Sequence, residues 1–116
     1  MDRIAEAESL ETIVRREVQD YAASPAYRAE LDFFEAPNKS LYSLVVIPRP
    51  NHPALKGPKI VIMAQVIADK VIIHQDTTDK PLIDELLRCG IPRAQIILRY
   101  AGETAPELSD EDTDEN

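Results

Sequence analysis

The chain has 116 residues, of which 44% are hydrophobic, 5% aromatic and 29% charged. This length fits a single domain with a mainly aliphatic core. The single cysteine, Cys89, excludes an internal disulfide and is typical of a reducing compartment. The first residues are charged where a signal peptide is apolar, and the longest apolar run is too short to span a membrane. We therefore expect a cytoplasmic protein without a membrane segment.

The formal net charge of −8 is unevenly distributed along the chain. Residues 103–116 contain seven acidic residues and no basic one, so the rest of the chain is close to neutral. Residues 36–68 contain four basic residues and no acidic one. We expect residues 1–102 to form the domain and residues 103–116 to form a disordered acidic tail.

Apolar residues from Leu10 to Tyr21 recur with helical spacing, which predicts an amphipathic helix with Ser9 as its N-cap. Proline at position 25 predicts the end of this helix, because proline restricts the residue before it. Four extended segments are then predicted, over residues 29–34, 41–47, 59–67 and 71–74. They are joined by a turn at 37–39, a proline-rich loop at 49–58 and a turn at 68–70.

A second helix is predicted to begin at an N-cap, Thr78, and to end before Gly90, with Arg88 in its last turn. Residues 96–98 then predict a short strand. Together these elements predict an α+β fold, with an antiparallel sheet of four or five strands and two helices packed on one face.

The sequence contains no motif typical of a catalytic, cofactor or metal site. The two histidines are not spaced with Cys89 as metal ligands, and the three glycines are too scattered for a phosphate loop. His74 and Asp76 are two residues apart, as in a catalytic pair on a strand, but Asp76 capping the following turn is the alternative. Cys89 is interpreted as a small buried residue rather than a nucleophile. No catalytic residue, cofactor or metal is therefore predicted.

The basic middle of the chain is the better candidate for a functional site. It could form a contact surface for a phosphate or an acidic partner, or it could consist of scattered solvated side chains. The acidic tail could fold back on this surface, compete with nucleic acid for a partner, or only increase solubility. The candidate contact residues are Lys39, Arg49, His52, Lys56 and Lys59.

Residues 71–98, with Gly-Ile-Pro-Arg at 90–93, resemble the XisI family, and so does Tyr-Ala-Ala-Ser-Pro-Ala-Tyr at 21–27. Members of this family are called fdxN element excision controlling factors and occur mainly in cyanobacteria. The proline-rich basic loop replaces a short hairpin of the family, and the acidic tail replaces a partly apolar one. The resemblance implies an accessory role in DNA element excision, beside a nuclease-fold companion called XisH.

The leading hypothesis is a non-enzymatic accessory factor that binds a XisH-like partner. One alternative is an antitoxin-like inhibitor of such a nuclease partner. Another is a module that binds nucleic acid directly through the loop at 49–59. An enzyme that uses His74 and Asp76 is a further alternative, and a homodimer remains open.

Overall fold

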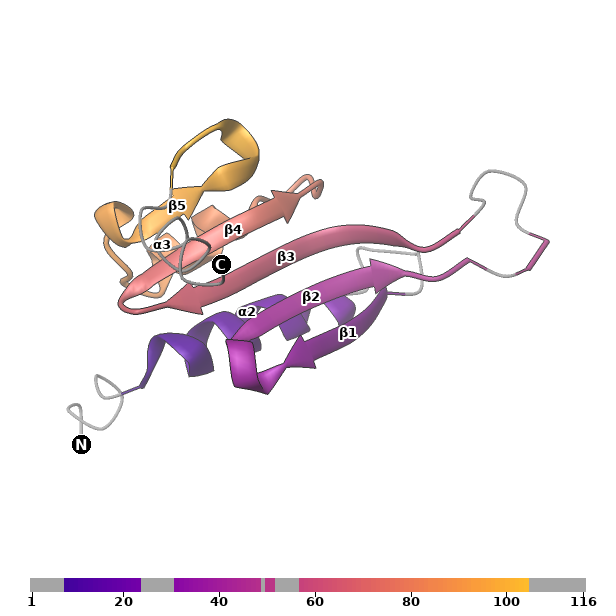
Figure 1. Ribbon diagram of the computed structural model, residues 1–116, viewed down its shortest axis with the longest axis horizontal. Helices are drawn as coiled ribbons and strands as arrows, with labels where there is room; N and C mark the ends of the chain where they lie inside the picture. Colours follow the sequence, from indigo (N-terminus) through magenta and orange to yellow (C-terminus); the bar gives the residue numbers. More distant parts are fainter. Residues whose placement is uncertain (1–7, 24–30, 49, 52–56, 105–116) are drawn as a thin grey trace, which may run out of the picture.

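The computed structural model describes residues 8–23, 31–48, 50–51 and 57–104. Five strands form one sheet, and two helices form a layer packed against it (Figure 1). In chain order the elements are α2 (Leu10–Ala23), β1 (Leu31–Ala36), β2 (Leu41–Val46), β3 (Lys59–Ile67), β4 (Lys70–Asp76), α3 (Leu82–Arg88) and β5 (Ile96–Leu98). Short 3₁₀ turns lie at Pro37–Lys39, Arg93–Gln95 and Arg99–Ala101.

The strands follow one another across the sheet in the order β1-β2-β3-β4-β5. The first four are antiparallel neighbours, as predicted, but β5 is parallel to β4. The prediction of a wholly antiparallel sheet is therefore wrong at this edge. The chain crosses over through α3 between β4 and β5, and a crossover of this kind returns the chain to run parallel. The predicted α+β class is confirmed.

The core lies between the sheet and the helices. Ser9 Oγ accepts a hydrogen bond from Thr12 N at 3.1 Å, which confirms Ser9 as the N-cap of α2. Val14 and Val18 of this helix are fully buried against the central strands, which contribute Leu44 and Ile62. α2 contacts β1, β2, β3 and α3, so it joins the antiparallel meander to the crossover unit.

Two register shifts interrupt the sheet. Leu44 pairs with Ile62 and Val45 with Ile60, which leaves Val61 as an extra residue in β3. His74 is the extra residue in β4, opposite Met63 and Ala64. Such bulges bend the strands and increase their twist. Figure 1 shows β3 curving as the β2–β3 hairpin extends away from the body of the protein.

The second helix begins later than predicted. α3 starts at Leu82, and Pro81 occupies the N-cap position. The Pro81 side chain forms no capping hydrogen bond. Asp76 at the end of β4 takes over this role, because its Oδ2 accepts a hydrogen bond from Leu82 N at 2.6 Å. Its Oδ1 accepts from Thr78 N at 2.9 Å. Thr78 is therefore not the N-cap, and local capping by Asp76 is confirmed.

The end of α3 matches the prediction. Gly90 has a φ of +95°, which is the left-handed conformation expected after a helix. Gly90 N donates to Leu87 O at 3.0 Å, and Ile91 N donates to Leu86 O at 3.2 Å. These two bonds form a Schellman motif and turn the chain towards β5. No helix within the described ranges is both long and apolar enough to cross a membrane.

Candidate interaction surface

The predicted basic residues do not all lie together. Lys39 ends the turn before β2, with only Ser40 between them, whereas Lys59 pairs with Val46 at the other end of that strand. A strand advances about 3.3 Å per residue, so the two exposed lysines are separated by roughly 20 Å. Arg49, His52 and Lys56 lie outside the described residues. Lys39 and Lys59 therefore belong to two different surfaces, one at each end of β2.

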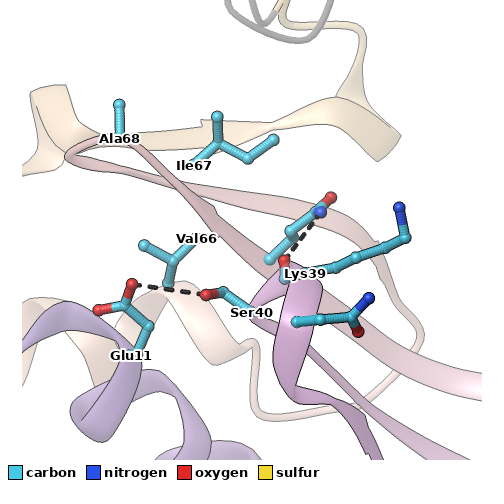
Figure 2. A pocket seen from close by; sticks show the side chains of 8 residues that line it. Glu11, Lys39, Ser40, Val66, Ile67 and Ala68 are labelled. Atoms are coloured by element: carbon cyan, nitrogen blue, oxygen red, sulfur yellow. Dashed lines mark hydrogen bonds between the residues drawn. The ribbon is translucent and has the colours of Figure 1, made fainter. Parts of the chain in front are cut away.

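Lys39 contributes to an open pocket of about 400 Å³ between α2 and two turns of the sheet (Figure 2). Ser40 and Ala68 in these turns have φ values of +49° and +58°, so both adopt the left-handed conformation that tight connections need. The lining is mostly polar and consists of Glu11, Asn38, Lys39, Ser40, Gln65, Val66, Ile67 and Ala68.

The pocket carries opposite charges on separate side chains. Ser40 Oγ donates a hydrogen bond to Glu11 Oε2 at 3.4 Å, and Figure 2 shows these two side chains pointing toward each other. The Lys39 side chain extends away from them (Figure 2). Lys39 forms no salt bridge with any residue in the described ranges. A cation and a carboxylate are thus both available to a polar partner.

Gln65 connects this pocket to His74. Its Nε2 donates to Lys39 O at 3.1 Å, and its Oε1 lies 2.9 Å from His74 Nε2. Because the amide nitrogen is used by Lys39 O, Oε1 faces the imidazole and His74 Nε2 must donate. Burial lowers the pKa of His74, and the nearby charge of Arg99 lowers it further. His74 is thus a neutral hydrogen-bond donor near neutral pH.

The hypothetical His74–Asp76 pair does not form. His74 bonds to Gln65, while Asp76 accepts bonds from Thr78 and Leu82. The two side chains have the right spacing in the sequence, but the bulge at His74 disturbs the simple alternation of the strand. Both residues serve the local structure rather than each other.

Cys89 is exposed, so the prediction of a buried cysteine is wrong. α3 ends at Arg88, which places Cys89 at the C-cap position. Its Sγ donates to Glu17 Oε2 at 3.4 Å and lies 3.9 Å from Arg16 Nη2. Desolvation raises the pKa of the thiol, and the Glu17 carboxylate raises it further. The thiol is therefore less reactive than an ordinary cysteine.

Among the described residues, no group of three or more histidine, cysteine or acidic side chains could hold a metal ion. An open and polar pocket is also unlike the enclosed, mainly apolar sites that bind small molecules. Its hydrogen-bonding groups suit a charged segment of another protein. Sequence reasoning identified Lys39 but not Gln65, although a glutamine within the apolar run of residues 60–67 was a detectable signal.

Solved structures from Anabaena variabilis ATCC 29413 share this fold. A XisI-like protein is 21% identical, with a TM-score of 0.66, and the match covers 84% of this chain and 86% of the other. The fdxN element excision controlling factor XisI is also 21% identical, with a TM-score of 0.57, covering 78% and 86%. No curated protein matches the chain. The family model for the XisI protein matches residues 1–110. The chain therefore belongs to the XisI family.

Proposed function

We propose that this protein is a non-enzymatic accessory factor in the excision of a DNA element, and that it acts by binding a XisH-like, nuclease-fold partner. The observation that carries this proposal is the family match over residues 1–110. A structural neighbour is itself named an fdxN element excision controlling factor. That name supports a role in excision control, and binding to another component of the reaction is the way in which we propose that this chain exerts it.

The state of the reactive side chains supports binding rather than catalysis. His74 donates to Gln65, Asp76 caps α3, and the pKa of Cys89 is raised. A general base or nucleophile needs a pKa matched to its task and access to substrate. His74 and Asp76 are instead engaged in hydrogen bonds of the fold, and the Cys89 thiol is less easily ionised, which supports a role for the surface in binding.

The pocket beside Lys39 is the surface that we assign to the partner. Lys39 provides a cation that forms no salt bridge with a described residue, and Glu11 provides a carboxylate on α2 that lines the same pocket. Opposite charges on one surface fix the orientation of a partner and exclude wrong ones. The partner segment should therefore carry both an acidic and a basic side chain.

Co-purification tests the proposal. The tagged protein, treated with nuclease, should retain a XisH-like protein from a lysate of its own organism. Lys39→Glu should weaken that retention at least tenfold, because it places like charges against the partner. Lys59→Glu is the matched control, since Lys59 is also exposed but lies at the far end of β2. Failure of the unaltered protein to retain any such companion would refute the proposed partnership.

The same complex separates an accessory factor from an antitoxin-like inhibitor. An inhibitor should abolish the DNA cleavage by its partner at equimolar concentration, and should relieve the toxicity of that partner in cells. An accessory factor should leave cleavage active and change its site or timing. Persistent partner toxicity on co-expression would contradict the inhibitor hypothesis.

Direct nucleic-acid binding is a second candidate, favoured by the shape of the β2–β3 hairpin. This hairpin extends from the body and carries the exposed Lys59 at the start of β3 (Figure 1). The loop at 49–58 adds Arg49, His52 and Lys56 in the sequence. Binding of the hairpin's three permanent cations, Arg49, Lys56 and Lys59, to phosphates would give a slope of about −2.7 in a plot of log affinity against log salt. Unchanged DNA affinity after Lys56→Ala and Lys59→Ala would exclude this loop.

A further inference from the structure

The two edge strands of the sheet, β1 and β5, differ in the hydrogen bonding of their outer main-chain groups. At β5, Arg93 Nη1 donates to Ile96 O at 2.7 Å, and Leu98 N donates to Glu103 Oε1 at 2.9 Å. Glu103 N donates in turn to Leu98 O at 3.1 Å, and its carboxylate is held by Arg93 at 2.8 Å. The outer main-chain groups of β5 are thereby occupied, which prevents another strand from adding there.

The edge at β1 has no such cover within the described ranges. β1 pairs with β2 on one side, and no other hydrogen bond between described residues involves its main chain. An open edge of six residues is a template for another strand, and proteins normally protect such edges. Within the part of the chain that the structure describes, β1 is thus the edge that can accept another strand.

The side chains of β1 differ on its two faces. Phe33 and Glu35 lie on the helical side, where Arg15 of α2 bonds to Glu35 at 2.9 Å and lies 5.4 Å from the centre of the Phe33 ring. Phe34 lies on the opposite side and is 48% exposed. Its neighbour on β2 is Ser43, which is too small to cover an aromatic ring. An exposed aromatic ring on an open edge is typical of an interface.

We propose that β1 pairs with β1 of a second copy of this chain, antiparallel, about a two-fold axis at Phe34. Such an axis keeps the helices of both copies on the same side of a continuous ten-stranded sheet, five strands coming from each chain. Two residues that lie directly opposite each other in an antiparallel pair point to the same side of the sheet. The two-fold axis must therefore pass midway between the two copies of one residue. Phe34 then lies opposite Phe34 of the partner subunit.

Charge decides among the alternative registers. An axis at Asp32 or Glu35 would place two identical carboxylates directly opposite each other, which is destabilising. An axis at Phe33 would place Asp32 opposite the exposed Phe34 and leave the two Asp32 side chains diagonal neighbours. Asp32 forms no salt bridge with a described residue that could offset this repulsion.

The axis at Phe34 avoids these conflicts. Asp32 then faces Ala36 of the partner subunit, and Glu35 faces Phe33 of the partner subunit. The two Glu35 side chains become diagonal neighbours, but each is already neutralised by its own Arg15. The exposed aromatic rings pair with each other, which adds to the main-chain hydrogen bonds of the new ladder. A second copy thus fits this edge without placing two carboxylates directly opposite each other, and Asp32 lies beside a small apolar residue rather than beside another charge.

The mass of the isolated protein in solution tests this inference independently of any partner. Sedimentation equilibrium from about 1 μM to 1 mM should show a shift from 13.0 kDa to twice that mass. Phe34→Glu should keep the protein at 13.0 kDa throughout, because it places two carboxylates face to face. Leu87→Glu, at a leucine with a similar exposure of 40% on α3, should leave the association unchanged. A native mass of 13.0 kDa at every concentration would overturn the proposal.

Cysteine cross-linking tests the register. In a Cys89→Ser background, Phe34→Cys should form an intermolecular disulfide on mild oxidation, since directly opposed residues have Cα atoms about 4.5–5.5 Å apart. Asp32→Cys should not, because the two copies would be four residues apart along the ladder. Preferential cross-linking of Asp32→Cys or Phe33→Cys would refute the axis at Phe34. Circular dichroism of each variant verifies that the fold is retained.

Discussion

Replacing Asp76 with alanine should destabilise the protein by about 2–4 kcal/mol, because one carboxylate organises the whole entry into α3. Its Oδ1 accepts from Thr78 N at 2.9 Å, and its Oδ2 accepts from Leu82 N at 2.6 Å. The Thr78 hydroxyl has one proton, which lies between Asp76 Oδ1 at 2.7 Å and Lys80 O at 2.8 Å. Two main-chain donors therefore depend on Asp76.

The magnitude follows from these two donors. Hydrogen bonds to a charged group contribute about 1.5–3 kcal/mol each, and loss of a helix cap costs about 0.5–2 kcal/mol. The terms overlap, because the Leu82 bond is itself the cap. A loss of about 3 kcal/mol is a large part of the 5–15 kcal/mol that holds a domain of this size. It should lower Tm by roughly 10–20 °C.

Urea unfolding followed by circular dichroism measures this loss. Asp76→Asn should lose about half as much as Asp76→Ala, because a single amide oxygen can serve Thr78 or Leu82 but not both. Asp69→Ala is the matched control, since the Asp69 side chain is 77% exposed and its one ion pair with a described residue is to Lys70, at 3.8 Å. It should change stability by less than about 0.5 kcal/mol. A loss below this value for Asp76→Ala would refute the capping role.

Three further predictions concern single residues. Gly90→Ala should lower the free energy of unfolding by about 1–2 kcal/mol, because a φ of +95° is unfavourable for alanine even though nothing lies within 4 Å of the added carbon. An unchanged Tm in thermal unfolding would contradict this. The pKa of Glu103 is lowered by its bonds to Leu98 N and Arg93, so its stabilising effect should be present at neutral pH and disappear as the pH falls below the pKa of an ordinary glutamate. Glu103→Gln should remove this part of the pH dependence of the urea midpoint, and an acid profile parallel to that of the unaltered protein would argue against it. The pKa of His74 is lowered by burial, so stability should fall as the pH decreases below about 6.5 and level off below the folded-state pKa. His74→Gln should flatten the plot of urea midpoint against pH in this range, and an identical slope would show that another group titrates.

The features that local patterns determine were predicted well. β3 and β5 occupy the predicted residues, and Gly90 ends α3 in the left-handed conformation. An apolar run between turn residues fixes a strand, and a glycine after a helical stripe fixes a C-terminus, without reference to the rest of the chain. The predicted pairing of the first four strands also follows from short connections.

The features that depend on distant contacts were missed. α3 begins at Leu82 because Asp76, six residues earlier, supplies the cap, and because the hydroxyl of Tyr21 donates to Lys80 O across the core. The Tyr21 contact leaves no local pattern in the sequence, and local capping by Asp76 was predicted, but not that its carboxylate would reach as far as Leu82 N. Cys89 was predicted to be buried because cysteines near a helix end are more often small buried residues than nucleophiles, whereas the structure places it exposed at the C-cap of α3.

The candidate site shows the same division. The turn at residues 37–39 and the cation of Lys39 were visible in the sequence. The pocket itself also needs Glu11 from α2 and Gln65 from β3, which only the fold brings next to that turn. The spacing between Lys39 and Lys59 was equally invisible, since it depends on which ends of β2 the two lysines occupy.

Calorimetric titration of this protein with a purified XisH-like protein from the same organism tests the central claim most directly. Both proteins should first be treated with nuclease so that nucleic acid cannot bridge them. The proposed function predicts saturable binding near one copy of each chain, with a weaker affinity for Lys39→Glu and an unchanged affinity for Lys59→Glu. Absence of binding between the two nucleic-acid-free proteins would contradict the claim that this XisI family member acts through a XisH-like partner.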